Sequence, residues 1–334
     1  MSTSTTQDSS GARGCPVCSA DDPDGPASVG PDGYCQSCGR KVPVSRDHAE
    51  FDLGLLAGVT DRGLRHERNE DAMALATASG PHGPVALAVV SDGVSSAPRP
   101  DEASLTAVRA AMRVLISSVQ TGEDPVGASV AAAKAGAQAL NDLVGPEGAP
   151  AATYVSAVVS DEVITVCWLG DSRAYWLTAD PADCNRLTRD DSLAEEIVAA
   201  GLASVDEAMA SPQAHVITRW LGADLPEPQP HIAQFAPPGP GVLLVCSDGL
   251  WNYRPEAADL AALALPAASA DPLAAAAGMV KFAVESGGID NVTVVLIPFP
   301  LAAHGKDPAD RTQTQADPAA DAPTETLPQT PAVS

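Results

Sequence analysis

Residues 153–177 read TYVSAVVSDEVITVCWLGDSRAYWL, in which apolar runs rich in β-branched residues follow one another with no helical pattern between them. Such runs, separated by polar turns, are typical of buried β-strands. Before them come two successive segments of helical periodicity, 101–119 and 125–144. Strands in runs and helices in pairs do not fit the alternation of a doubly wound parallel sheet. The order therefore predicts a layered α+β sandwich.

The same patterns divide the chain into one large domain and several small segments. Further strand-like runs begin at Leu53, Val85, Gly241 and Asn291, and further helical patterns cover 192–200 and 271–286. We expect the large domain to span 51–300, with a cysteine-bearing module at 14–40 and a polar linker at 41–50. Residues 1–13 and 301–334 have almost no large apolar side chains, so disorder is predicted there.

The charge balance excludes several classes of partner. The 334 residues include 19 Lys and Arg against 43 Asp and Glu, a formal net charge of −24. A binder of nucleic acid or of an anionic membrane needs a basic face, which this composition disfavours. No apolar run is long enough to span a bilayer, and the N-terminus lacks the pattern of a signal peptide. We expect a cytoplasmic protein, and a monomer.

Four of the seven cysteines form two Cys-x2-Cys pairs, Cys15 with Cys18 and Cys35 with Cys38. This spacing is typical of a tetrahedral zinc site with four thiolate ligands, which leaves no open position for catalysis. The pattern predicts one structural Zn²⁺. The alternatives are a redox dithiol and unligated cysteines in a flexible arm.

Acidic residues recur where the predicted strands end. Asp92, Asp171 and Asp248 follow apolar runs, Asp290 precedes one, and Glu70-Asp71 forms a further acidic pair. A single Asp-Gly is usually only a turn. Several carboxylates at the ends of buried strands are costly unless a metal ion or hydrogen bonds satisfy them. The set predicts a site for Mg²⁺ or Mn²⁺, which prefer oxygen ligands.

The order of these motifs resembles the metal-dependent Ser/Thr phosphatases of the protein phosphatase 2C (PPM) family, in the bacterial type. The matching pieces are TDRGLRHERNEDA (60–72), VVSDG (89–93), Thr153, GDSRAYWL (170–177), RLTRDDSLAEEIVAAG (186–201), HVITRWLG (215–222), LLVCSDGLW (243–251) and GGIDNVTVV (287–295). The resemblance implies a four-layer α-β-β-α sandwich, with two central β-sheets flanked by helices. It also implies that 187–222, called the flap segment below, lies beside the active site and is mobile.

The resemblance further implies a site with two Mn²⁺ or Mg²⁺ ions. Asp92 matches the aspartate that bridges them, and the carbonyl of Gly93 matches another ligand. Asp248 and Asp290 match the ligands of the first metal, and Glu70 and Asp71 match the acidic pair near the second. Asp171 matches an aspartate at a third, weaker position. The implied reaction is hydrolysis of phosphoserine and phosphothreonine in proteins by a hydroxide that bridges the two metals.

The sequence departs from the family pattern at the phosphate-binding position. Many members have an arginine where this chain has His66, and Arg65 and Arg68 flank it. Any of the three could bind the substrate phosphate, and Arg65 is the nearer of the two arginines to the usual place. We expect Arg173 to pair locally. The alternative function is a weak or inactive phosphatase fold that acts as a binding module, but all the expected carboxylates are present.

Overall fold

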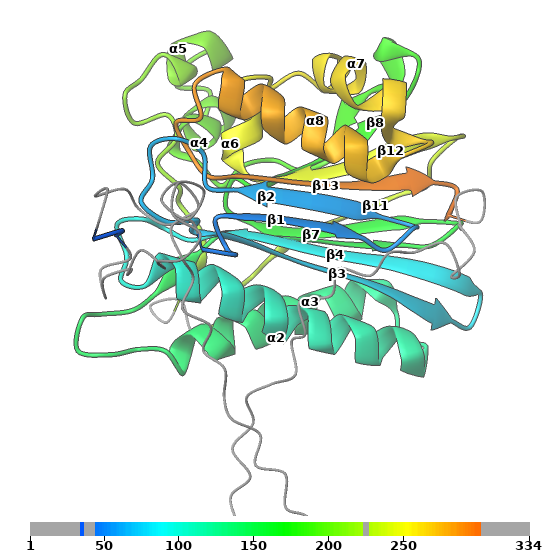
Figure 1. Cartoon of the computed structure of the whole chain (residues 1–334), viewed down its shortest axis with the longest axis horizontal. Helices are drawn as coiled ribbons and strands as arrows, with labels where there is room; N and C mark the ends of the chain where they lie inside the picture. Colours follow the sequence, from blue (N-terminus) through cyan, green and yellow to red (C-terminus); the bar gives the residue numbers. More distant parts are fainter. Residues whose placement is uncertain (1–33, 37–43, 223–226, 302–334) are drawn as a thin grey trace, which may run out of the picture.

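Two antiparallel β-sheets form the centre of the molecule (Figure 1). The computed structural model describes residues 34–36, 44–222 and 227–301. The larger sheet has the order β1-β2-β13-β12-β8-β9. Its strands are β1 His48–Asp52, β2 Ala57–Asp61, β8 Arg173–Leu177, β9 Asn185–Arg186, β12 Gly241–Cys246 and β13 Val292–Phe299.

The second sheet has the order β11-β7-β6-β4-β3. Its strands are β3 Asp71–Gly80, β4 Gly83–Asp92, β6 Tyr154–Val159, β7 Ile164–Leu169 and β11 His231–Phe235. A short separate pair, β5 Ala151–Ala152 with β10 Leu221–Gly222, connects the flap segment to the chain that precedes β6. This pair matters for the site because β5 runs beside the end of β4.

Helix pairs cover the outer faces of the sheets (Figure 1). Helices α2 (Pro100–Thr121) and α3 (Pro125–Asn141) pack on the five-stranded sheet. Helices α7 (Ala257–Ala268) and α8 (Pro272–Glu285) pack on the six-stranded sheet. The short helices are η1 (Pro181–Asp183), α4 (Leu193–Ala199), α5 (Val205–Met209) and α6 (Asp248–Trp251).

Small aliphatic side chains fill the space between the two sheets. Val90 and Val155 on one sheet belong to the same buried cluster as Leu243 and Val295 on the other. Trp176 is the largest fully buried side chain there, and its ring lies 5.4 Å from that of Phe235. Because aromatics make up only 4% of the sequence, the core depends on close packing of Ala, Val and Leu.

The predicted mixed α+β class, with two sheets and flanking helices, is confirmed. Two long elements were not predicted, β3 and α7. The sequence of β3, DAMALATASG, is rich in Ala and poor in β-branched residues, so its strand propensity is low. It forms because it pairs with β4 along the full length of both strands. Tertiary pairing therefore overrides local propensity at this position.

The C-terminal part of the predicted linker 41–50 is instead structured. Residues 48–50 begin β1, which pairs with β2. The side chain of Arg46 donates to the backbone oxygens of Asn69 (3.0 Å) and Asp101 (2.6 Å). These backbone acceptors are far from Arg46 in the sequence. No local pattern therefore indicated that the end of the linker packs against the large domain. Leu301 is also ordered and buried, although 301–334 was predicted to be disordered.

The other terminal predictions fall mostly outside the described residues. These are the disorder of 1–13 and 302–334 and most of the cysteine module 14–40. Among the residues that are described, no helix is long and apolar enough to cross a membrane.

Candidate active site

Asp71 and Asp92 face each other at the end of the β3–β4 pair. Asp71 is the first residue of β3, Asp92 is the last residue of β4, and the two are direct partners in the strand register. Directly opposed residues have Cβ atoms about 5 Å apart. The backbone N–H of Asp92 donates to Oγ1 of Thr153 at 2.9 Å. Strand pairing thus positions the first two carboxylates.

The carboxylate of Asp71 is buried and only half satisfied. Its Oδ2 accepts hydrogen bonds from the hydroxyls of Ser247 (2.6 Å) and Thr293 (2.7 Å). Its Oδ1 is buried and has no hydrogen-bond partner within the described part of the chain. A buried anionic oxygen without a partner is costly, and a bound cation would remove that cost.

Asp248 and Asp290 come from the other sheet. Asp248 begins α6 directly after β12, and Asp290 lies two residues before β13, the neighbour of β12. The side-chain amide of Asn252 donates to Oδ2 of Asp248 at 3.1 Å. Oδ1 of Asp248 has no partner among the described residues, like Oδ1 of Asp71.

The glycines that follow Asp92 and Asp248 have a packing role. A Cβ at Gly93 would lie 2.1 Å from the carbonyl oxygen of Pro100. A Cβ at Gly249 would lie 1.9 Å from the carbonyl oxygen of Asn291. No other residue fits at these close approaches. The requirement for glycine is therefore explained by packing at both positions, and ligation by the carbonyl of Gly93 stays a prediction.

Asp171 lies in the turn between β7 and β8, on the side of the site nearer the flap segment. It is buried, and its backbone oxygen accepts the indole N–H of Trp251 at 3.0 Å. The pKa of Asp171 is raised to about 7, chiefly by burial and secondarily by the charge of Asp190, while Arg173 opposes the rise. Arg173 itself is buried and pairs with Asp190 at 2.6 Å, so its predicted local role is confirmed.

Glu70 is buried beside the loop that follows Asp92. Its Oε2 accepts the hydroxyl of Ser95 at 2.5 Å, and its Oε1 lies 3.7 Å from Nε of Arg68. The backbone oxygen of Glu70 accepts the N–H of Gly93 at 3.1 Å. Glu70 therefore connects β3 to the start of the 93–97 loop.

Burial, with repulsion between neighbouring aspartates as a second cause, raises the pKa of several of these carboxyls. Burial is the main cause at Asp92 and Asp248, and neighbouring aspartates add to it, so that both pKa values lie well above the ordinary range. Burial also raises the pKa of Asp71 to about 6, against the opposing effect of its two hydroxyl donors. Divalent cations would reverse this balance because they stabilise the ionised forms.

The donor set fits a hard divalent cation. The candidate ligands are carboxylate oxygens and the carbonyl of Gly93, and Oδ1 of Asp71 and Oδ1 of Asp248 have no hydrogen-bond partner among the described residues. Asp92, Asp248 and Asp290 keep part of their surface accessible, whereas Asp71, Asp171 and Glu70 are buried. Within the described ranges, no three His, Cys, Asp or Glu side chains are arranged tightly enough to hold an ion by themselves. Water and backbone oxygens would have to complete the coordination.

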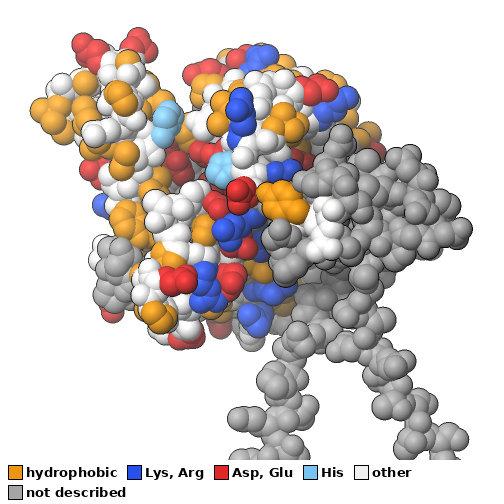
Figure 2. Space-filling view, turned by 60° about the vertical axis from the view of Figure 1, so that its left-hand side comes forward, with side chains coloured by type: hydrophobic (Ala, Val, Ile, Leu, Met, Phe, Trp, Pro, Cys, Tyr) orange, Lys and Arg blue, Asp and Glu red, His pale blue; other side chains and the backbone are white. Residues whose placement is uncertain are grey.

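The candidate phosphate-binding residues differ in their surroundings. His66 is directed into the acidic cluster, with Nε2 3.1 Å from Asp290 and Nδ1 4.0 Å from Glu70. Arg68 is engaged with Glu70 and with Asp101. Arg65 is exposed and forms no ion pair with any residue that the structure describes. Figure 2 shows basic side chains among the acidic ones on this face of the molecule, despite the net charge of −24.

Two asparagines that the sequence analysis did not single out hold the site together. The side chain of Asn291 accepts the N–H of Glu70 (2.7 Å) and donates to the carbonyls of Arg62 (2.8 Å) and Arg68 (3.1 Å). The side chain of Asn69 donates to Thr60 and to the carbonyl of Arg46. Both asparagines adjoin a candidate ligand, which was the only signal in the sequence.

A second unpredicted cluster joins the flap segment to the body of the protein. Oδ1 of Asp191 lies 2.7 Å from Nε2 of His231, and its Oδ2 accepts the N–H of Gly170 at 3.0 Å. The backbone oxygen of Asp191 accepts the N–H of Thr218 at 2.8 Å. The ring of His231 stacks on Trp168, with centroids 5.1 Å apart. Asp191 thus ties the turn that carries Asp171 to both ends of the flap segment.

The predicted zinc site is described at one position only. Cys35 is buried and forms no disulfide with the described cysteines. Cys15, Cys18 and Cys38 lie outside the described residues. Four-thiolate ligation stays a prediction.

Known proteins share this arrangement of sheets and motifs. Residues 62–269 match the family model described as protein phosphatase 2C. The chain is 32% identical over 157 residues to the serine/threonine phosphatase stp of Listeria innocua, a match covering 46% of this chain and 59% of that protein. It is 32% identical over 145 residues to protein phosphatase PhpP of Streptococcus pneumoniae, covering 43% and 55%. The chain thus spans slightly more than half the length of these curated relatives.

Two mycobacterial crystal structures match over almost their whole length. The PPM Ser-Thr phosphatase MsPP from Mycobacterium smegmatis, in complex with cacodylate, has a TM-score of 0.58 and 29% identity, covering 72% of this chain and 97% of that one. The serine/threonine phosphatase PstP/Ppp of Mycobacterium tuberculosis has a TM-score of 0.59 and 26% identity, covering 72% and 96%.

Proposed function

Because the chain belongs to the protein phosphatase 2C family, we propose that it hydrolyses phosphoserine and phosphothreonine in proteins with the help of two divalent cations, Mn²⁺ or Mg²⁺. The observation that carries this proposal is the group of carboxylates at the strand ends, in which Asp71 and Asp248 each have a buried oxygen without a partner among the described residues. An unliganded cluster of this kind is costly for a protein that does not bind cations.

The carboxylates divide into two sets. Asp92, Asp248 and Asp290 are partly accessible, and we assign them as the direct ligands, with Asp92 between the two ions. Asp71 and Glu70 are buried, so they would act on the second ion through water, and this water would supply the missing partner of Oδ1 of Asp71. Asp171 would serve a third, weaker position. The bound cations would activate a water molecule for attack on phosphorus and neutralise charge on the phosphoryl oxygens.

His66 is proposed to contact the substrate phosphate. Its imidazole is held between Asp290 and Glu70, next to the ligands, whereas the guanidinium of Arg68 is more exposed and is paired with Asp101 as well as with Glu70. Arg65 forms no ion pair with a described residue and would attract the substrate from the surface. An imidazole makes fewer contacts with a phosphate than an arginine fork, so we expect weaker ground-state binding of phosphate than an arginine would supply.

Turnover by the purified full chain tests the proposal. Phosphothreonine peptides and p-nitrophenyl phosphate are incubated with Mn²⁺, with Mg²⁺, and with a chelator. Metal-dependent release of phosphate that the chelator abolishes is the expected result. Absence of release with either ion, from a chain with a cooperative thermal transition, would favour the alternative of a non-catalytic binding module.

The cysteine module would contribute partner choice or localisation. Its four thiolates are predicted to hold one structural Zn²⁺, which would supply most of the folding free energy of so small a segment. Zinc content measured on the purified chain, and on a Cys15→Ser/Cys18→Ser variant, tests this. One equivalent in the first and none in the second is expected.

A further inference from the structure

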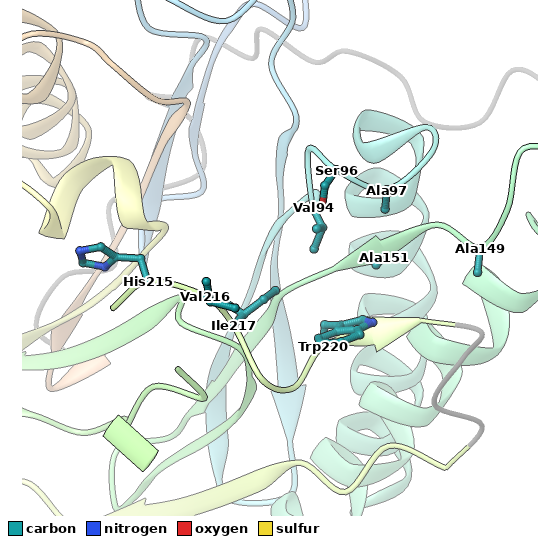
Figure 3. A pocket seen from close by; sticks show the side chains of 9 residues that line it. All are labelled: Val94, Ser96, Ala97, Ala149, Ala151, His215, Val216, Ile217 and Trp220. Atoms are coloured by element: carbon teal, nitrogen blue, oxygen red, sulfur yellow. The ribbon is translucent and has the colours of Figure 1, made fainter. Parts of the chain in front are cut away.

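A pocket lies between the 93–97 loop and the end of the flap segment (Figure 3). Its water-accessible volume is about 450 Å³. One wall is formed by Val94, Ser96 and Ala97, the next by Ala149 and Ala151, and the third by residues 215–217 with Trp220. The volume is in the range of a small-molecule or side-chain binding site.

The pocket adjoins the candidate active site through the backbone that follows Asp92. The N–H of Val94 donates to the carbonyl of Ala151 at 2.9 Å, and the N–H of Thr153 donates to the carbonyl of Asp92 at 2.7 Å. Residues 151–153 therefore run beside residues 92–94. Val94 follows Asp92 by two positions, so the chain separates them by at most about 7 Å.

Most of the lining side chains are apolar, with Ser96 and His215 as the polar exceptions among the described residues. Among the described residues that line the pocket, none is Lys, Arg, Asp or Glu, although the site next to it is densely charged. His215 lies at one end, where its ring is directed to Trp251 at a centroid distance of 5.8 Å. Val216 is 54% exposed, so it is open to contact from solvent. An apolar group that entered would be removed from water on three sides.

We propose that this pocket binds an apolar side chain of the substrate, from a residue next to the phosphorylated one. This inference rests on the proposed function. It assigns the substrate class as phosphopeptides in which a residue next to the phosphorylated one has a side chain of the size of Leu or Met. Neighbouring residues of an extended peptide are 3.3–3.6 Å apart along its axis. Asp92 and Val94 are two positions apart in the chain, so the distance between them is within two such steps. With the phosphate at the carboxylate site, one flanking side chain reaches the apolar walls.

The test varies one residue of the peptide and one residue of the pocket. A single leucine is moved through the two positions on each side of phosphothreonine in an otherwise alanine-rich peptide, and kcat/KM is measured with the full chain and Mn²⁺. We expect a gain on the order of tenfold at one position. In Ala149→Phe, which fills the pocket from a loop outside the carboxylate site, the gain should disappear. The matched control Ala210→Phe, at an exposed position of the flap segment outside the pocket, should keep it.

A small substrate separates this inference from the proposed function. N-acetyl phosphothreonine amide has no flanking side chain, so its turnover should be equal in wild type, Ala149→Phe and Ala210→Phe. If wild type does not turn over even this substrate, the proposed function fails. If it does, but leucine gains less than twofold at every position or the gain survives in Ala149→Phe, the pocket inference is overturned. A preference that changes with enzyme concentration would instead assign the pocket to a second copy of the chain and also overturn it.

Discussion

The carboxylate site and the flap segment lie side by side but are built differently. The carboxylates project from strand ends whose neighbours are fully buried, and buried hydroxyls and asparagines hold them. The flap segment has a small core of Ala194, Ala208 and Ala214, and it leaves Leu202 77% exposed and Val205 61% exposed. The carboxylates are therefore held by rigid elements, whereas the flap segment is supported by few buried contacts.

The largest expected effect is at the site. Asp92→Asn should lower Mn²⁺-dependent turnover of p-nitrophenyl phosphate by about 10²- to 10⁴-fold, because a neutral amide cannot balance two cations. Asp180→Asn, an exposed cap of η1, is the control and should leave turnover unchanged. Retention of more than about a tenth of the activity by a folded Asp92→Asn chain would show that the site does not depend on this carboxylate.

The next effect concerns pH and the stability of the metal-free protein. The pKa of Asp71 is raised to about 6 and that of Asp171 to about 7, both chiefly by burial. A carboxyl with a raised pKa stabilises the fold while protonated, and this contribution is lost as pH rises through the folded-state pKa. Between pH 5.5 and 8 the chelated protein should lose on the order of 2–3 kcal/mol of stability.

Mn²⁺ should reverse this trend. Cations bind the ionised carboxylates, so the rise in Tm on adding Mn²⁺ should be larger at pH 8 than at pH 5.5. Calorimetry with and without chelator measures both slopes. Asp71→Asn is the matched variant, and its chelated form should show a smaller fall in Tm with pH. A Tm in chelator that rises from pH 5.5 to 8 would contradict the assignment.

Loss of the Asp191 cluster should have a smaller effect, mainly on the flap segment. Asp191→Ala leaves the N–H of Gly170 and the imidazole of His231 without an acceptor, which should cost about 1–3 kcal/mol of stability. Turnover should fall several-fold, since the turn that carries Asp171 is no longer held. The surface change Leu202→Ser, in the same segment, should stay within about 0.5 kcal/mol.

A double-mutant cycle shows whether Asp191 acts through His231. If it does, the effects of Asp191→Ala and His231→Ala on stability and kcat/KM should be clearly less than additive. Additive effects would show that the 2.7 Å contact between the two side chains does not couple the flap segment to β11.

The smallest expected effect separates His66 from Arg65. His66→Ala should raise KM for a phosphopeptide by roughly tenfold with a smaller change in kcat, because the imidazole lies beside the ligands. Arg65→Ala should change KM by less than about threefold at moderate salt, as expected for an exposed charge. A larger rise in KM for Arg65→Ala than for His66→Ala would assign phosphate binding to Arg65 instead.

The positions of the carboxylates could be predicted because each follows a local rule. Asp92 ends an apolar strand, Asp248 follows one, and each precedes a glycine. This pattern can be recognised in the sequence without knowledge of any tertiary contact. The asparagine network and the Asp191–His231 contact could not be predicted. Asn291 bonds to Glu70, 221 positions away, and His231 lies 40 positions from Asp191. Nothing in the local sequence indicates such partners.

The sequence by itself determined the class of fold, the acidic strand ends and the family, because hydrophobic periodicity and motif spacing are properties of short segments. Only the tertiary structure decided which carboxylates are buried and which stay accessible, and that β3 pairs with β4 despite its weak strand propensity. It also decided that an apolar pocket adjoins a charged site, since loops 93–97 and 215–220 meet only after the sheets are packed. Burial, pKa and cavity shape depend on contacts between segments that are far apart in the sequence. No single segment contains both partners of such a contact, so local patterns do not predict it.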